Sequence, residues 1–156
     1  MARYGPLESE WAQYQEPAYA FFRRMGLDPH RAADLAQETL LRALQGAHRY
    51  RGEGSVRAWV LGIARNLLRE WLRSARREVP MASVVDSGGT ETLAGDWVDV
   101  DRALARLDPD HREVLVLRFV LDLPSRDVAA ALGISDDAVR SRVARAKADF
   151  RRVWSP

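Results

Sequence analysis

The 156-residue sequence contains no cysteine, so disulfide bridges, thiolate zinc sites and thiol chemistry are excluded. Its three histidines, His30, His48 and His111, are isolated from one another, and each is expected to lie at the surface. No metal-ligand spacing, phosphate-binding glycine loop or dinucleotide-binding turn is present. The sequence therefore predicts neither a metal nor a cofactor, and it lacks the paired nucleophile and base of an enzyme.

Long apolar runs are also missing, and none approaches the roughly 20 residues that cross a bilayer as a helix. The first eleven residues, MARYGPLESEW, lack the apolar core of a signal peptide. Both observations predict a cytoplasmic protein without membrane insertion.

Lysine is nearly absent, since 23 of the 24 basic residues are arginine, and the net charge is only +2. The charge is unevenly distributed along the chain. Residues 1–47 carry a net charge of −1, residues 48–77 carry +6, residues 78–110 carry −6 and residues 111–156 carry +3. Two basic blocks separated by an acidic block indicate two contacts with a polyanion.

Hydrophobic residues recur at intervals of three and four, which is typical of helices, and no strand pattern or repeat is present. Residues 80–95 lack periodicity and contain Gly88-Gly89 and several hydroxyl residues, as linkers do. We therefore predict an all-α protein with two small helical domains, 6–77 and 97–154, joined by a flexible linker over 78–96. Helices are expected over residues 8–26, 29–46, 56–77, 97–107, 109–121 and in two further segments within 124–152.

The spacing also predicts which side of each helix is buried. In the second helix we expect burial of Ala33, Leu35, Ala36, Leu40, Leu41 and Leu44. In the long third helix the apolar face is Trp59, Val60, Ile63, Leu67, Leu68 and Trp71. The opposite face of that helix is polar and carries Arg57, Arg65, Asn66, Arg69, Arg73, Arg76 and Arg77.

Residues 124–152 read as two short helices around a tight turn. Gly133 stands where a helix ends in a left-handed residue, and Ser135 is a candidate N-cap for the second helix. That helix has an apolar face of Val139, Val143, Ala146 and Phe150, and its basic residues lie off this face. The pattern is typical of a helix-turn-helix, and an ordinary helical hairpin with a solvated basic face is the alternative. The alanines at 129–131 favour the former, because its helices approach closely.

The loop over residues 50–55, YRGEGS, leads into the arginine-rich third helix. An aromatic and basic loop of this kind can hold an unstacked base while arginines bind phosphate. The alternative is a solvated loop and a solvated helix face. The like charges of Arg65, Arg69 and Arg73 at intervals of four repel one another unless a polyanion or acids offset them.

Three segments in order resemble the extracytoplasmic-function (ECF, group IV) sigma factors of bacterial RNA polymerase, which belong to the sigma-70 family. They are DLAQETLLRAL (34–44), YRGEGSVRAWVLGIARNLLREWLRSARR (50–77) and LDPDHREVLVLRFVLDLPSRDVAAALGISDDAVRSRVARAKADFR (107–151). The resemblance implies that 6–77 is sigma region 2 and 97–154 is sigma region 4. It implies core RNA polymerase and promoter DNA as partners, through the β′ clamp helices and the β flap, and an anti-sigma factor as a regulator.

The resemblance also implies residue roles. Contacts with the polymerase β′ subunit fall on Asp34, Gln37, Glu38 and Arg42. Recognition and melting of the −10 element fall on Tyr50, Arg51, Gly52, Ser55, Arg65, Asn66, Arg69 and Arg73. Recognition of the −35 element falls on Ser135, Asp137, Arg140, Ser141, Arg142 and Arg145.

Some positions depart from the family pattern. Gly54 stands where the family often has serine or another small polar residue, and Gly62 interrupts the long helix at a cost of about 1 kcal/mol relative to alanine. Asp136 and Asp137 place acids at the groove end of the recognition helix.

Three functions follow from the sequence as alternatives. The first is a promoter-specificity subunit without catalysis, the second is a stand-alone helix-turn-helix regulator, and the third is an enzyme such as a recombinase. The first two differ in whether Gln37 and Glu38 bind polymerase or are merely solvated.

Overall fold

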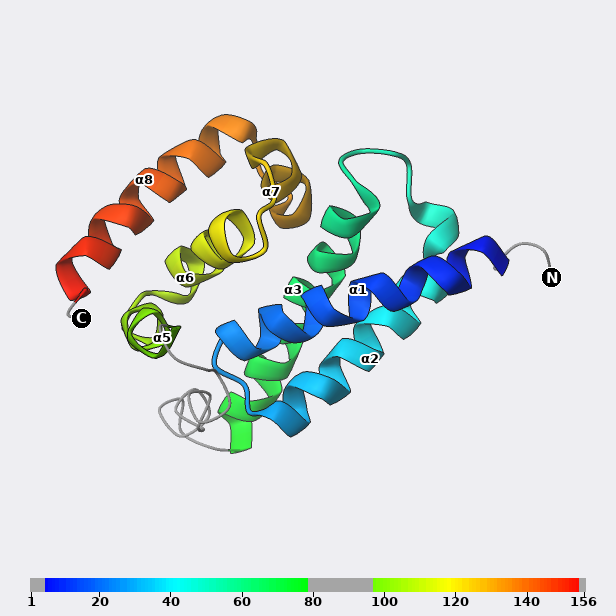
Figure 1. Ribbon diagram of the computed structural model, residues 1–156, viewed down its shortest axis with the longest axis horizontal. Coiled ribbons are helices and arrows are strands. Elements are labelled where there is room, and N and C mark those ends of the chain that lie inside the picture. Colours follow the sequence, from blue (N-terminus) through cyan, green and yellow to red (C-terminus); the bar gives the residue numbers. More distant parts are fainter. Residues whose placement is uncertain (1–4, 79–96, 155–156) are drawn as a thin grey trace.

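The computed structural model describes residues 5–78 and 97–154, and over these residues the chain is helical without strands, as predicted (Figure 1). All of the predicted linker except residue 78 lies outside the described residues. The α-helices are α1 (Gly5–Arg24), α2 (Pro29–Gln45), α3 (Val56–Glu78), α5 (Trp97–Ala105), α6 (Pro109–Leu115), α7 (Ser125–Leu132) and α8 (Asp136–Val153). A 3₁₀ turn, η1 (Ala47–Arg49), precedes α3, and a π-helical turn, η2 (Val116–Val120), continues α6.

Local side-chain caps account for several helix starts, as the sequence predicts. The Asp28 carboxylate accepts from the Arg31 backbone N–H at 2.9 Å, and the Ser135 hydroxyl accepts from the Ala138 N–H at 3.1 Å. Pro29 and Pro109 occupy first-turn positions, where a missing N–H is tolerated. Gly133 ends α7 with φ +67° and ψ +34°, the left-handed conformation that glycine adopts without steric cost.

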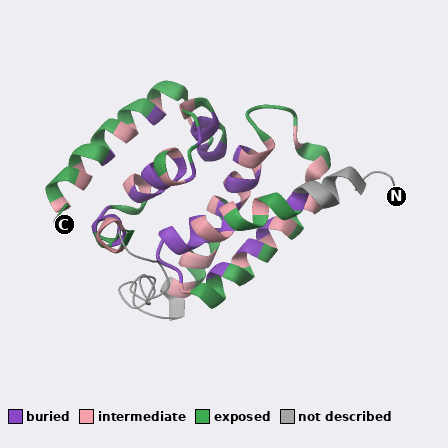
Figure 2. Cartoon of the chain, viewed as in Figure 1, coloured by how far each residue is buried: buried purple, intermediate pink, exposed green. Residues whose placement is uncertain are grey.

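The first three helices form one half of the molecule, and the helices from α5 to α8 form the other. α1 and α2 lie side by side, and α3 runs between them and the second half, where it packs against α7 (Figure 1). α8 is at the outer edge, with buried residues on its inner side and exposed residues outside (Figure 2). α3 therefore makes the most extensive contact between the halves, and α1 also contacts η2.

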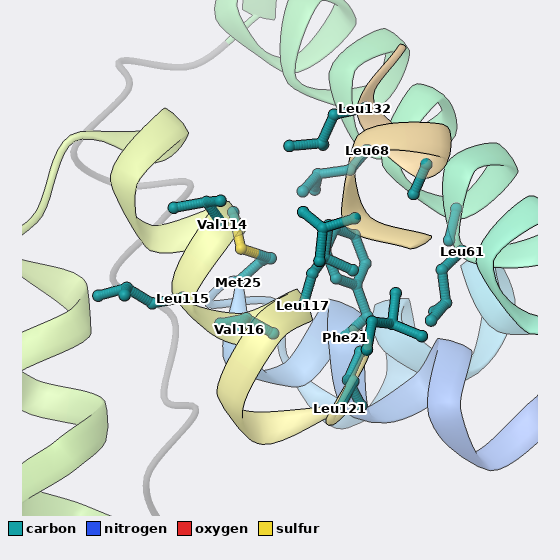
Figure 3. Close-up of a cluster of buried hydrophobic side chains, with 14 of the residues drawn as sticks. Phe21, Met25, Leu61, Leu68, Val114, Leu115, Val116, Leu117, Leu121 and Leu132 are labelled. Carbon is teal, nitrogen blue, oxygen red and sulfur yellow. The ribbon is translucent and has the colours of Figure 1, made fainter. Parts of the chain in front are cut away.

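One hydrophobic core joins the two halves (Figure 3). Phe21 of α1, Met25 just after it and Leu61 of α3 belong to the same buried cluster as Leu117 and Leu132 of the second half. A smaller cluster of Trp11, Ala43 and Val60 closes the far end of the first half. Burial of this shared apolar surface stabilises the arrangement of the halves as well as each half.

The buried face of α2 differs from the predicted one. Ala33 is exposed and Leu41 is 50% exposed, whereas Ala32 and Thr39, which were not predicted, are fully buried with the predicted Ala36. Small side chains at Ala32, Ala36 and Ala43 permit close packing on α1 and α3, so the leucines are displaced toward the rim. The prediction followed the larger side chains and was wrong for Ala33 and Leu41.

α3 is buried on more than the predicted face. Ala58, Leu61 and Ala64 are buried besides the predicted Val60, Leu67 and Leu68, because the second half covers another side of the helix. Among the described helices, none is long and apolar enough to cross a membrane.

Candidate nucleic-acid interface

The predicted recognition helix, α8, presents a basic outer face. Arg140, Ser141 and Arg145 are exposed, and Arg142 is half-buried. Asp137 is exposed and pairs with Arg140, whose Nη1 lies 3.3 Å from Asp137 Oδ1. Ser135 caps the helix, so its hydroxyl is already used by the backbone. The face therefore offers guanidinium and hydroxyl donors of the kind that contact base edges and phosphates in a major groove.

The loop before α3 is held by its own side chains. The Tyr50 hydroxyl donates to the Gly54 carbonyl at 2.6 Å, and its ring lies 5.8 Å from that of Trp59. Gly52 and Gly54 have φ of +82° and +73°, which let the loop turn sharply. Arg51 and Gly52 are exposed at its tip. Tyr50 thus supports the loop in this structure and does not extend from it toward solvent.

Ser55 joins the loop to the second half. Its hydroxyl accepts from the Ala58 N–H at 3.0 Å, which caps α3, and donates to Asp127 Oδ2 at 2.9 Å. Its backbone N–H donates to Asp127 Oδ1 at 3.3 Å. One predicted −10 residue is therefore bound to the first turn of α7.

The arginines predicted to face the −10 strand are divided between two environments. Arg65 Nε lies 3.3 Å from both carboxylate oxygens of Glu113, which is fully buried. Arg69 Nη2 lies 2.5 Å from Asp110 Oδ1 and 3.0 Å from Glu113 Oε2. Asn66 and Arg73 are exposed and line, with Arg65, Arg69 and Glu70, an open hollow of about 400 Å³.

These ion pairs alter the titration of their members. The hydrogen bond from Arg69 holds the pKa of Asp110 below its ordinary value, against the opposing effect of partial burial. Burial lowers the pKa of Arg69, but the hydrogen bonds and charges of Asp110 and Glu113 outweigh burial, and the net pKa is raised. Both groups are therefore charged at neutral pH.

The predicted polymerase-facing residues lie on one side of α2. Asp34, Gln37 and Arg42 are exposed and Glu38 is half-exposed. Arg42 donates to Glu70 of α3 at 2.8 Å and to Glu38 at 3.3 Å, and the hydrogen bond with Glu70 raises its pKa. This bridge fixes the polar face of α2 relative to α3.

Sequence periodicity missed an apolar part of this surface. The exposed Leu41 lies beside Gln37 and contributes with Trp11, Leu40 and Leu44 to a hollow of about 320 Å³. A contiguous apolar patch with polar residues at its edge is typical of a protein-binding surface. The sequence does indicate an apolar surface here, because this segment contains four closely spaced leucines. It does not show which of these leucines is displaced to the exposed side of α2.

A second apolar surface lies on the other half. A groove of about 430 Å³ is bounded by α5, η2 and α8 and is lined by Trp97, Val100, Leu104, Leu115, Phe119, Val120, Lys147, Phe150 and Arg151. Phe119 is 48% exposed in it. This groove is separate from the basic outer face of α8 and adds a candidate protein contact that no sequence motif indicated.

The environment of His111 differs from the predicted one. His111 is not isolated, because its Nδ1 lies 2.6 Å from Asp149 Oδ2 and its side chain is largely buried. This contact joins α6 to α8, 38 residues along the chain, and sequence spacing does not reveal it.

Within the described parts of the chain, no group of three or more metal-ligating side chains comes together.

Family models match both halves of the chain. The model of sigma-70 region 2 matches residues 11–78, and the model of sigma-70 region 4 matches residues 97–150. These matches place α1, α2 and α3 in region 2, and α5 to α8 in region 4.

Curated relatives are similar over most of the chain. The probable RNA polymerase sigma-C factor of Mycobacterium bovis is 36% identical over 122 residues, which cover 74% of this chain and 66% of that protein. The ECF RNA polymerase sigma factor EcfG of Rhodopseudomonas palustris is 35% identical and the match covers 82% of this chain and 74% of that protein. SigL, an ECF sigma factor of Mycobacterium tuberculosis, is 34% identical, with 85% and 81% covered.

Solved structures agree with the sequence comparison. The sigma factor RpoE of Bartonella quintana, solved in complex with the anti-sigma factor NepR, is similar with a TM-score of 0.78 and 25% identity, covering 95% of this chain and 96% of that one. CnrH, solved with the cytosolic domain of CnrY, is similar with a TM-score of 0.65 and 27% identity, covering 96% and 86%. The two regions in their order, together with these relatives, show that the chain belongs to the ECF family of RNA polymerase sigma factors.

Proposed function

We propose that this chain binds core RNA polymerase and directs promoter-specific initiation by recognising −35 and −10 elements. The observation that carries the proposal is the exposed basic face of α8, which extends from Arg140 to Arg145. This face lies on a capped helix-turn-helix, and the same chain also contains a region 2. Family membership supports the same role. The boundaries we propose are 6–77 for region 2, 78–96 for the linker and 97–154 for region 4.

For the −35 element, we assign major-groove and phosphate contacts to Arg140, Ser141, Arg142 and Arg145. The exposure of Arg140, Ser141 and Arg145 on α8, with Arg142 half-buried beside them, supports this assignment. Asp137 pairs with Arg140 and orients that guanidinium, which lessens the repulsion between the acid and nearby phosphates. Ser135 contributes through the helix start that it caps.

For the polymerase, we assign the surface of α2 that combines Asp34, Gln37, Glu38 and Arg42 with the apolar hollow around Leu41. A polar rim beside an exposed apolar patch supports a protein partner, and the family points to the β′ clamp helices. The groove beneath α8 that exposes Phe119 is the surface on region 4 we assign to the β flap.

For the −10 element, we assign Tyr50, Arg51, Gly52, Ser55, Arg65, Asn66, Arg69 and Arg73. In the structure Asn66 and Arg73 are exposed, whereas Ser55, Arg65 and Arg69 are bound by carboxylates of region 4. The assignment therefore requires that these contacts be exchanged for nucleic acid.

Catalysis is left to the polymerase in this proposal, and the chain supplies only specificity. We place the chain in the cytoplasm, where it meets polymerase and promoter. An anti-sigma factor is a further proposed partner, because the similar sigma factor RpoE was solved in complex with an anti-sigma factor.

Run-off transcription with core polymerase on a randomised promoter library tests the proposal. We expect transcripts from templates that share two short elements, and none when the chain is omitted. Absence of template-selective transcripts with an otherwise active core enzyme would contradict the proposal.

A pull-down of core polymerase separates this function from a stand-alone regulator. We expect Glu38→Arg to reduce polymerase capture strongly, because it reverses a charge within the α2 surface and repels Arg42. Glu16→Arg, the same charge change at an exposed position on α1, is the matched control. Equal capture by both variants would favour the regulator, which needs no polymerase surface.

A further inference from the structure

A pocket lies where α1 meets the start of α3, and none of its residues is assigned above to polymerase or promoter. Its volume is about 430 Å³, and its lining includes Gln13, Tyr14, Glu16, Pro17, Arg57 and Leu121. This volume is within the range of small-molecule pockets, roughly 300–1,000 Å³. We propose that the pocket binds a guanine base, which Arg57 recognises through two parallel hydrogen bonds.

Arg57 is the residue that points to a ligand. Its side chain is half-buried and its Nε is shielded from solvent without a hydrogen-bond partner. Within the described part of the chain, no hydrogen bond or ion pair joins Arg57 to another residue. A polar group that is buried without a partner costs free energy, and a charged group costs more. A ligand that accepts hydrogen bonds from Arg57 would remove this cost.

The position of Arg57 in α3 adds to the cost. Arg57 is the second residue of the helix, and the first turn of α3 contains no acidic residue. The N-terminus of a helix carries a partial positive charge, so a cation at that end is destabilising. Arg65 and Arg69, further along the same helix, have carboxylate partners. Arg57 is therefore the α3 arginine for which an electronegative ligand has most to offer.

The rest of the lining favours an aromatic ring over a phosphate group. Glu16 brings a negative charge to the same pocket, which opposes the entry of an anion. Tyr14 and Leu121 supply aromatic and apolar surface, and unstacked bases pack on surfaces of this kind. The pocket thus combines one strong donor with walls that suit a flat, uncharged ring.

Gln13 supplies acceptors to the same pocket. Pro17 lies inside α1 and has no N–H, so the Gln13 carbonyl four residues earlier lacks its intrahelical donor. The Gln13 side chain adds an amide oxygen. A ligand with N–H groups as well as acceptors therefore matches the lining better than a ligand with acceptors alone.

Guanine has this combination of groups. The two parallel N–H donors of an arginine pair with the O6 and N7 atoms of guanine, which is the commonest specific contact between a side chain and a base. Adenine presents an amino donor in place of O6, and that donor would face the Arg57 cation. Guanine also carries N–H donors for the acceptors of Gln13.

Two sources can supply the base, namely a free guanine nucleotide or a guanine within a single strand. Arg57 follows Ser55 by two residues, so the pocket lies next to the loop assigned to the −10 element. The strand source rests on the proposed function, whereas the free nucleotide does not.

Titrations of the full chain test the proposal. The free probes are guanosine, adenosine and cytidine monophosphates, with dissociation constants measured by NMR titration. The strand probes are thymine oligonucleotides of one length that carry a single guanine, adenine or cytosine at each position in turn, measured by fluorescence anisotropy. Arg57→Ala removes the guanidinium, and Arg57→Lys keeps the charge without the paired donors. Arg102→Ala, which removes an exposed arginine on α5, is the control.

We expect guanine to be bound about tenfold more tightly than adenine or cytosine, which corresponds to one bidentate contact. A preference among the mononucleotides identifies the free nucleotide as the ligand, and a preference confined to the oligonucleotides identifies the strand. Arg57→Ala and Arg57→Lys should both abolish the preference, and Arg102→Ala should retain it. Far-ultraviolet circular dichroism checks that each variant is folded.

Equal binding of all bases by wild type in both sets of probes would overturn the proposal, as would a guanine preference that persists in Arg57→Lys. If Arg57→Ala weakens all oligonucleotides equally and Arg57→Lys restores them, Arg57 binds phosphate and the guanine site is wrong. These titrations use the chain alone. They therefore decide the guanine site even if run-off transcription with active core enzyme fails and the proposed function fails with it.

Discussion

At the residue scale, the arginines of this chain differ in what already binds them. Arg145 on α8 is exposed, whereas Arg65 and Arg69 on α3 are held by carboxylates. An exposed guanidinium can bind DNA without first losing a protein partner. The two kinds of arginine should therefore respond differently to mutation.

We expect Arg145→Ala to weaken binding of a −35 duplex. If Arg145 binds phosphate, the slope of log binding constant against log salt concentration should become less steep by about 0.9. If Arg145 binds a base edge, discrimination between the right and wrong base at one position should fall by about 1–3 kcal/mol. Fluorescence anisotropy across a salt series measures both. Arg152→Ala, near the end of the same helix and paired with Asp149, is the control. Equal effects of the two variants would contradict the assignment.

Asp110 predicts a pH dependence at the same scale. Arg69 lowers the pKa of Asp110, with smaller contributions from Arg142 and Arg65. A carboxylate with a lowered folded-state pKa stabilises the fold fully above its ordinary pKa of 3.8, and that contribution is lost as the pH falls through the lowered value.

Wild type should therefore exceed Asp110→Asn in unfolding free energy at neutral pH, and the difference should shrink as the pH falls below about 4. Urea unfolding between pH 7 and pH 3 measures this. A difference independent of pH would contradict this prediction and show that Asp110 acts through packing alone.

At the scale of elements, two different faces of α3 pack against two different parts of the molecule. One face packs on α1 and α2, and another packs on α7 through Gly62. Glycine within a helix costs about 1 kcal/mol of stability relative to alanine. The close approach of the Ala131 backbone, which leaves little room for a side chain, explains why glycine stands at position 62.

Gly62→Leu should separate α3 from α7 while favouring the helix itself, because leucine is a better helix former than glycine. We expect a larger radius of gyration in small-angle scattering and several-fold tighter binding of a single-stranded −10 oligonucleotide. Asn66→Leu, an exposed position on the same helix, controls for added hydrophobicity in the scattering measurement. A wild-type radius of gyration for Gly62→Leu would count against a close α3–α7 contact.

At the scale of the whole molecule, the two sigma regions share one core. Phe21, Leu61 and Leu117 are all fully or almost fully buried within it. A protein with one contiguous core unfolds as one cooperative unit.

We expect far-ultraviolet circular dichroism and tryptophan fluorescence to give coincident urea transitions for wild type. Gly62→Leu should resolve two transitions, because the regions then unfold separately. Two transitions in wild type would show that the shared core adds little to stability.

Local features of this fold were predictable because their causes are local. The caps Asp28 and Ser135 bind backbone N–H groups three residues later, and Gly133 ends a helix through its own backbone conformation. The helix-turn-helix and the basic outer face of α8 follow from the same short spacings. The exposure of Leu41 was missed because leucines on several sides of α2 compete for burial, and small neighbours decide the outcome.

The sequence by itself therefore determined the helices, their caps, the recognition helix and the family to which the chain is similar. Only the tertiary structure decided which arginines are free. Arg65 and Glu113 are 48 residues apart, as Ser55 and Asp127 are 72 apart, and helical periodicity carries no information over such separations. The physical reason is that a charged face is equally compatible with solvent, nucleic acid or a carboxylate, and the packing of α6 and α7 on α3 selects the carboxylate.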